Sequence, residues 1–272
     1  AMYAKGEGVS EPDKKKTCEL YKKAAKQGNP KAQYNLAVMY SKGDGVDKNN
    51  KKAAKYYQKA ADQDLPQAAF NLGVLYFKGS PELPADKEKA AELFEKTTVL
   101  NPNNSKALYN LAIMHMKGEG VEKDEVKARE YFEKAAQLNN KDALLNLGLM
   151  YYEGTAGVRK DKTMAFDCYK RSADLGNDKA QLNLALMCQK GEGCDIDKEM
   201  AKKYFQLAAD QGNTQAQINL GLLLLGGDED DQDKAKQYLN EAAKEGNVDA
   251  MVGLAKRYQL DDETESAIKW YT

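Results

Sequence analysis

Residues 105–136, SKALYNLAIMHMKGEGVEKDEVKAREYFEKAA, contain the pattern that decides the fold. In the first part, apolar residues recur at i, i+3, i+4 and i+7, which is the spacing of an amphipathic helix. The second part, from Lys127 to Ala136, has the same spacing. Gly118 and Gly120 stand between them, and glycine is the residue that most easily adopts the left-handed conformation that ends a helix. The stretch therefore predicts two helices joined by a short turn.

The same pattern recurs along the whole chain. The motif A-x-x-N-L-[A/G] occurs six times, and each copy runs into a glycine and then a segment of the type K-A-x-x-[Y/F]-[Y/F/L]-x-K-A-A. Its alanines, at intervals of 36, 39, 36, 37 and 36 residues, are Ala32, Ala68, Ala107, Ala143, Ala180 and Ala216. A seventh copy starts at Ala250, with Gly253 in place of the asparagine. Such a period is typical of stacked helix pairs, so we predict an all-α solenoid of about seven antiparallel helix-pair repeats.

The repeat boundaries follow from local signals. Gly-Asn pairs such as Gly28-Asn29 and Gly176-Asn177 predict a glycine that ends one helix and an asparagine that N-caps the next, and Pro30 suits a first helical position. These signals divide one solenoid into a partial repeat 1–29, repeats 30–65, 66–104, 105–140, 141–177, 178–213 and 214–247, and a truncated repeat 248–272. Two turns depart from the pattern: residues 80–84 lengthen one, and the acidic run 228–233 predicts a solvated turn in another.

The motifs L-[A/G]-x-x-Y, G-x-G-V and K-A-x-x-[Y/F]-[Y/F], recurring in register, resemble those of the Sel1-like repeat (SLR) family, relatives of tetratricopeptide repeats. The resemblance covers essentially the whole chain. It implies a right-handed superhelix and a role as an adaptor in multiprotein assemblies. It also implies that one face of each leading helix lines the inner wall of the superhelix.

Helical periodicity identifies that face. At 100° per residue, Lys31, Asn35, Val38 and Lys42 lie opposite the apolar side of their helix. The equivalent asparagines, one per repeat, are Asn35, Asn71, Asn110, Asn146, Asn183 and Asn219. An amide offers both donors and an acceptor, so this ladder could clamp an extended peptide backbone. Alternatively, the amides could bond to a neighbouring repeat and fix the stacking register.

Lysines flank the asparagine ladder. Those at the end of the leading helices are Lys42, Lys78, Lys117 and Lys190. They favour an acidic segment or a C-terminal carboxylate as the partner, although Asp142 and Glu153 interrupt the basic field in the fourth full repeat. We therefore predict a scaffold that binds proteins or peptides in an asparagine-lined, lysine-flanked groove. The alternative is an architectural subunit of a large assembly.

Other functions have weaker signals. The 41 basic and 42 acidic residues nearly cancel, so no net charge attracts nucleic acid, and no apolar stretch reaches the ~20 residues of a membrane span. The single histidine, His115, occupies a core position, and no phosphate loop, metal motif or cofactor site is predicted. Ser266 to Lys269 match the SxxK motif of penicillin-recognising enzymes without its partner motifs. We predict no enzyme and no cofactor, with a penicillin-interacting hydrolase as the remaining rival.

Two features concern the setting of the protein. The chain opens and closes inside predicted helices, which suggests a piece of a longer protein or complex. Cys18, Cys168, Cys188 and Cys194 show no paired spacing and slightly favour a reducing compartment such as the cytoplasm, with reduced, buried thiols as the expectation and a Cys188–Cys194 disulfide as an alternative. Asn103-Asn104-Ser105 is a glycosylation sequon that a lumenal protein could use.

Overall fold

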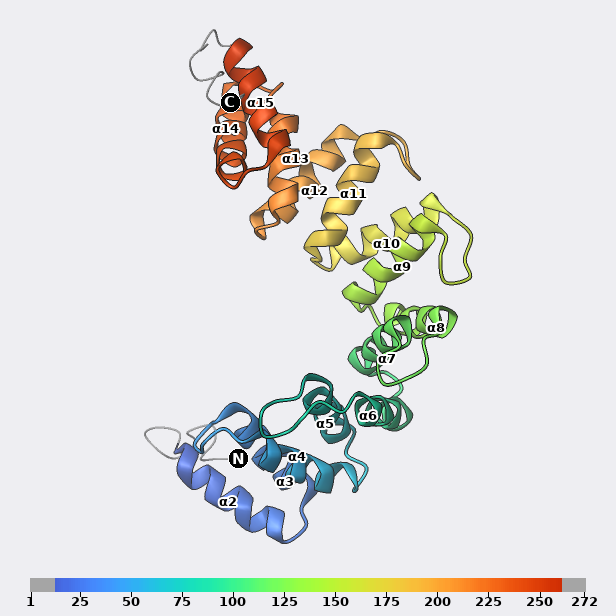
Figure 1. Ribbon diagram of the computed structural model, residues 1–272, viewed down its shortest axis with the longest axis vertical. Coiled ribbons are helices and arrows are strands. Elements are labelled where there is room, and N and C mark those ends of the chain that lie inside the picture. The colour runs from blue at the N-terminus through green and yellow to red at the C-terminus, as the bar shows by residue number, and fades with distance from the viewer. Residues whose placement is uncertain (1–12, 261–272) are drawn as a thin grey trace. The chain divides into compact units, whose positions relative to one another are not determined.

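A computed structural model describes residues 13–260, which are helical with short connections (Figure 1). The all-α prediction is confirmed. The helices of this part of the chain are α2 (Lys14–Lys26), α3 (Pro30–Lys42), α4 (Asn50–Ala61), α5 (Pro66–Lys78), α6 (Lys87–Leu100), α7 (Ser105–Lys117), α8 (Glu125–Gln137), α9 (Lys141–Glu153), α10 (Lys162–Asp174), α11 (Asp178–Lys190), α12 (Lys198–Asp210), α13 (Thr214–Leu224), α14 (Glu229–Lys244) and α15 (Val248–Leu260). Ser266 and both chain ends lie outside the described residues. None of these helices has the length and apolarity to cross a membrane.

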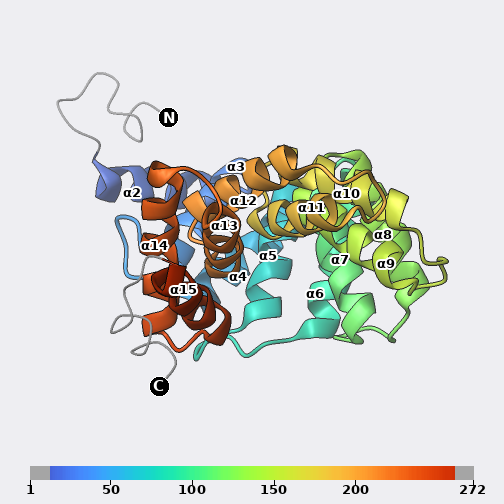
Figure 2. The ribbon, with the colours of Figure 1, turned by 90° about the horizontal axis from the view of Figure 1, so that it is seen from above.

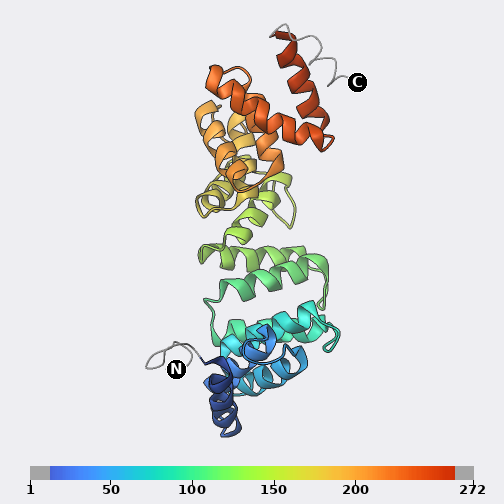
Figure 3. The same cartoon turned by 90° about the vertical axis from the view of Figure 1, so that its left-hand side faces the viewer.

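The chain divides after Leu138 into two compact units. The N-terminal unit holds α2–α8, and the C-terminal unit holds α9–α15. Within each unit, the two helices of a repeat pack most extensively, as α7 and α8 do in Figure 3, and each pair also packs on its neighbour in sequence. Helices α14 and α15 lie side by side in Figure 2. These contacts are those of stacked helix pairs; that all repeats form a single continuous solenoid stays a prediction.

The core alternates small and aromatic side chains. Ala53, Ala90 and Ala201 occupy the same position of the second-helix motif and are fully buried. Their small side chains let the helix backbones approach closely. The aromatic position of the second helices supplies bulk, since Phe94 and Phe205 have almost no exposed surface. Both positions of the second-helix motif therefore lie in the core.

Asparagine begins each leading helix that follows a Gly-Asn pair, as predicted, whereas α5 begins after Leu65 without a side-chain cap. The side chain of Asn29 accepts a hydrogen bond from the Ala32 amide at 3.0 Å, and that of Asn213 accepts one from the Ala216 amide at 3.1 Å. The first backbone amides of a helix have no acceptor within the helix, and here the asparagine side chain accepts from the amide of the alanine that begins the repeat motif. Pro30 is the first residue of α3, also as predicted.

In three repeats a G-[D/E]-G-[V/C] turn, at residues 43–46, 118–121 and 191–194, ties the repeat to the preceding one. A Cβ atom on Gly120 would lie 2.3 Å from the carbonyl oxygen of Lys87, and one on Gly193 would lie 2.2 Å from that of Lys162. Both glycines also have positive φ, of +70° and +74°, where other residues are strained. The acidic residue of the turn forms an ion pair with the same preceding helix: Lys14–Asp44 at 2.7 Å, Lys87–Glu119 at 2.9 Å and Lys162–Glu192 at 2.9 Å.

Two predictions about turns are wrong. The acidic run is not a solvated turn, because Asp228 N-caps α14 and Glu229 to Asp231 form its first turn, where acidic side chains interact favourably with the helix dipole. The left-handed glycine cap is present at Gly43, Gly118, Gly154 and Gly191, but α13 ends at Leu224 without one. Gly79 has positive φ but an extended ψ of 174°, since the chain turns there into a tight loop with hydrogen bonds between Ser80 and Leu83.

Candidate functional site

The predicted face lies on the leading helices α3, α5, α7, α9, α11 and α13. All six asparagines of the ladder are half-buried, so they are neither sealed in the core nor fully accessible. The four lysines are exposed, and each is the last residue of its helix, where a cation complements the helix dipole. Leu149 and Leu222, which occupy the apolar position of this face, expose 43% and 38% of their surface. We call these positions the first-helix face.

The asparagines fall into groups by their hydrogen bonds. The amide of Asn71 donates to the Tyr34 hydroxyl of the preceding repeat at 3.2 Å, and it also interacts with the Tyr57 hydroxyl. Asn183 interacts in the same way with the hydroxyl of Tyr169. In contrast, the amides of Asn146 and Asn219 donate to carbonyl oxygens of their own helices, those of Asp142 and Gln215, at 2.8 and 2.7 Å.

The residue at the aromatic position of the preceding second helix explains this division. Tyr57 and Tyr169 each offer a hydroxyl to the asparagine that follows, whereas Phe132 and Phe205 offer none. An asparagine side chain without that hydroxyl partner donates instead to the backbone carbonyl oxygen one helical turn earlier. Asn71 and Asn183 thus join consecutive repeats, while Asn146 and Asn219 bond within their own helix.

This division predicts different costs for removing the amides. We expect Asn71→Ala to lower the free energy of unfolding by about 0.5–1.5 kcal/mol, because it removes a bond between repeats. The double variant Asn146→Ala/Asn219→Ala, which removes only bonds within single helices, should change it by less than about 0.5 kcal/mol. Urea unfolding followed by circular dichroism measures both. Equal destabilisation would show that the stacking role extends along the whole ladder.

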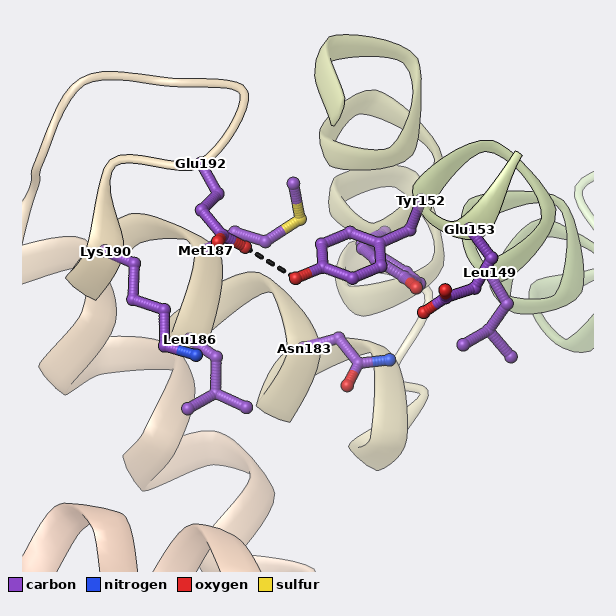
Figure 4. A pocket seen from close by; sticks show the side chains of 9 residues that line it. Leu149, Tyr152, Glu153, Asn183, Leu186, Met187, Lys190 and Glu192 are labelled. Atoms are coloured by element: carbon purple, nitrogen blue, oxygen red, sulfur yellow. Dashed lines mark hydrogen bonds between the residues drawn. The ribbon is translucent and has the colours of Figure 1, made fainter. Parts of the chain in front are cut away.

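A pocket of about 230 Å³ opens on the first-helix face of the C-terminal unit (Figure 4). Helices α9 and α11 supply most of its wall, and it brings together two of the predicted site residues, Asn183 and Lys190. Asn146 and Asn219 do not line it. Its lining residues are Leu149, Tyr152, Glu153, Tyr169, Asn183, Leu186, Met187, Lys190 and Glu192.

One edge of this pocket is held by a hydrogen-bonded trio. The Tyr152 hydroxyl donates to Glu192 Oε2 at 2.7 Å, as the dashed line in Figure 4 marks, and Lys162 Nζ lies 2.9 Å from Glu192 Oε1. The two donors lower the pKa of Glu192, and the bond to Glu192 raises the pKa of Tyr152. Glu192 is therefore ionised and fixed at neutral pH. The sequence analysis missed Tyr152 and Glu192; the signal was the acidic residue of the G-[D/E]-G turn.

The described residues show little that resembles a catalytic centre. His115 is buried, with Nδ1 3.3 Å from the Glu122 carbonyl oxygen and its ring stacked on Tyr131. No group of three or more His, Cys, Asp or Glu side chains within residues 13–260 could hold a metal ion. The four cysteines are present as free thiols.

The family of the chain follows from comparison with known proteins. The model of the Sel1 repeat matches residues 1–29, 30–65, 66–97, 105–140, 141–177, 178–213 and 214–247. The chain belongs to the Sel1 repeat family. Sel1 and tetratricopeptide-like repeat proteins are generally protein-interaction scaffolds and are typically non-enzymatic. No curated protein sequence matches the chain significantly.

Many solved structures resemble this Sel1 repeat chain, and two of them share about 30% of its sequence. One is a protective antigen with an SLR fold from uropathogenic Escherichia coli strains, 29% identical, with a TM-score of 0.86 over 99% of this chain and 58% of the antigen. The other is a Sel1 repeat protein from Oxalobacter formigenes, 30% identical, with a TM-score of 0.69 over 85% of this chain and 96% of that protein. The chain thus spans little more than half of the antigen's length.

Proposed function

We propose that this chain is a protein-interaction adaptor and that the first-helix face of its N-terminal unit binds an extended acidic segment of a partner. The proposal rests on the positive charge of this face. Lys42, Lys78 and Lys117 end three successive leading helices at exposed positions. Within residues 13–260, none of the three forms an ion pair with a carboxylate. A row of unpaired cations attracts an anionic chain.

The acidic residues that follow Lys42 and Lys117 in the turn are paired with other lysines. Asp44 follows Lys42 by two residues, but it pairs with Lys14 of the preceding repeat, and Glu119 likewise pairs with Lys87. The amides of Asn35 and Asn110 lie on the same face and can bond to a peptide backbone. Because each such bond contributes only about 0.5–1.5 kcal/mol net, binding requires several repeats together.

The face of the C-terminal unit supports the adaptor role with different chemistry. Asp142 and Glu153 offset its lysines, so it lacks the basic field of the N-terminal unit. Its pocket is lined in part by the apolar side chains of Leu149 from α9 and of Leu186 and Met187 from α11. We infer that this pocket takes an apolar side chain of a partner, while Asn183 and Lys190 bond to polar groups beside it.

We assign no catalytic role to the chain. The one histidine is packed in the core, and the SxxK serine, Ser266, is outside the described residues. Turnover of nitrocefin, or labelling of Ser266 by a fluorescent penicillin, would contradict this assignment.

Fluorescence anisotropy with a peptide of alternating Glu and Leu, compared with its Lys-for-Glu counterpart, tests the acidic-segment proposal. We expect the acidic peptide to bind more tightly, and the triple variant Lys42→Glu/Lys78→Glu/Lys117→Glu to weaken it at least about 10-fold, because it reverses three charges on one face. The affinity should also fall with added salt, which screens charges separated by more than about 8–10 Å.

The matched control reverses three other exposed lysines of the N-terminal unit, Lys51, Lys55 and Lys127, which lie on second helices. It changes the net charge equally and should weaken binding less than about 3-fold. Equal losses for the two triple variants would refute a site on the first-helix face. Self-association of the chain with no peptide binding would favour the architectural alternative.

A further inference from the structure

Two cysteines occupy neighbouring positions of a single repeat. Cys188 stands where other repeats have Tyr40 or His115, and Cys194 stands where they have Val46 or Val121. Tyr40 and Val46 pack in the same core cluster. Cysteine therefore occupies both of these core positions in the same repeat, and in the described part of the chain no other repeat has cysteine at either position.

The fold brings the two thiols together. Cys188 is fully buried near the end of α11, whereas Cys194 is partly exposed in the turn that follows. The Asp197 amide donates to the Cys188 carbonyl oxygen at 3.0 Å, which turns the chain back on the helix end. Both side chains line one cavity of about 370 Å³ and lie within hydrogen-bonding reach of each other. Two cysteines must lie close together for a disulfide to form between them without a displacement of the backbone.

We propose that Cys188 and Cys194 form a reversible disulfide with a small-molecule disulfide such as oxidised glutathione as the oxidant. The thiolate of the accessible Cys194 attacks one sulfur of the oxidant and releases one thiolate. Cys188 then loses its proton and attacks Sγ of Cys194, which releases the second thiolate. Two protein thiols are oxidised, one disulfide is reduced to two thiols, and both protons pass to the products.

The disulfide would join the end of α11 to the turn that carries Glu192, two residues before Cys194. Glu192 holds Tyr152 and Lys162 and lines the pocket of the C-terminal unit. The crosslink therefore fixes a turn on which one wall of that pocket depends. Formation of this disulfide does not depend on peptide binding by the first-helix face. A negative result for one of the two proposals therefore leaves the other standing.

Thiol counting after equilibration of the native chain in oxidised glutathione tests the proposal. Burial raises the pKa of Cys188 to about 12 and also raises that of Cys194, so exchange is slow and the incubation should run for hours. Unfolding in excess alkylating agent should then label two cysteines in the oxidised chain and four in the reduced chain. The unreacted pair should be Cys188 and Cys194, since Cys18 and Cys168 are buried on separate helices.

Tryptic digestion locates the crosslink, because cleavage after Lys179, Lys190 and Lys198 places the two cysteines in separate peptides, 180–190 and 191–198. We expect these peptides to be joined until a reductant is added. Cys194→Val, which restores the residue of sister repeats, should keep three labelled thiols and no joined peptide. Four labelled thiols in the treated wild-type chain, or a stable glutathione adduct on Cys194, would overturn the proposal.

Discussion

Gly193→Ala should destabilise the C-terminal unit by about 3 kcal/mol, whereas Gly212→Ala should cost only about 1 kcal/mol. Both glycines have positive φ, of +74° and +83°, so both variants meet the left-handed penalty of about 1–2 kcal/mol, partly offset by lost freedom in the unfolded chain. The two positions differ in the space available for a Cβ atom. The added Cβ would lie 2.2 Å from the Lys162 carbonyl oxygen at Gly193 and would meet nothing within 4 Å at Gly212. The difference of about 2 kcal/mol therefore measures close packing between repeats.

Urea unfolding gives the two free energies, and hydrogen exchange locates the damage. Amides of α10 and α11 should lose protection in Gly193→Ala, because these helices pack where the turn meets Lys162. The Lys162–Glu192 ion pair should break in the same variant. If both variants lost the same stability, backbone strain alone would explain the glycine, and the turn would not be a contact between repeats.

Structural features that depend only on residues close in sequence were predictable from the sequence. Asn29 caps α3 because its side chain reaches an amide three residues away, and Pro30 needs no partner beyond its own ring geometry. The acidic run was misassigned because Asp228 to Asp231 suit a turn and a helix start equally well in composition. Packing of the following helix on α13 decides between them, and composition does not report packing.

The candidate site was predictable in part for the same reason. Helical periodicity placed Asn183 and Lys190 on one face, and both line the pocket. Periodicity within one repeat could not tell which amides bond across repeats, since that depends on whether the preceding repeat offers Tyr169 or Phe205. It also could not place Glu192 against Tyr152, which lies 40 residues earlier. Aligning residues of one repeat with those of the next would reveal both relations.

Phe94→Ala and Phe205→Ala should each lower stability by about 3–5 kcal/mol, but in different compact units. The two residues share one position of the repeat, and they are 1% and 0% exposed. Truncation removes the apolar surface of a ring and leaves a cavity that surrounding helices fill only partly. Phe94 packs with Leu111 and Met114 in the N-terminal unit, whereas Phe205 belongs to a separate cluster that includes Leu184 and Leu220.

Because contacts in a repeat protein reach only neighbouring repeats, each truncation should act locally. Hydrogen exchange should show lost protection in α5–α7 for Phe94→Ala and in α11–α13 for Phe205→Ala, with the other unit retaining its protection. Each variant is thus the control for the other. Loss of protection throughout the chain in either variant would mean that the two units unfold as one cooperative body. The stability of the chain would then not be a sum of contributions from its repeats, and the Asn71 and Gly193 effects could not be assigned to single contacts between repeats.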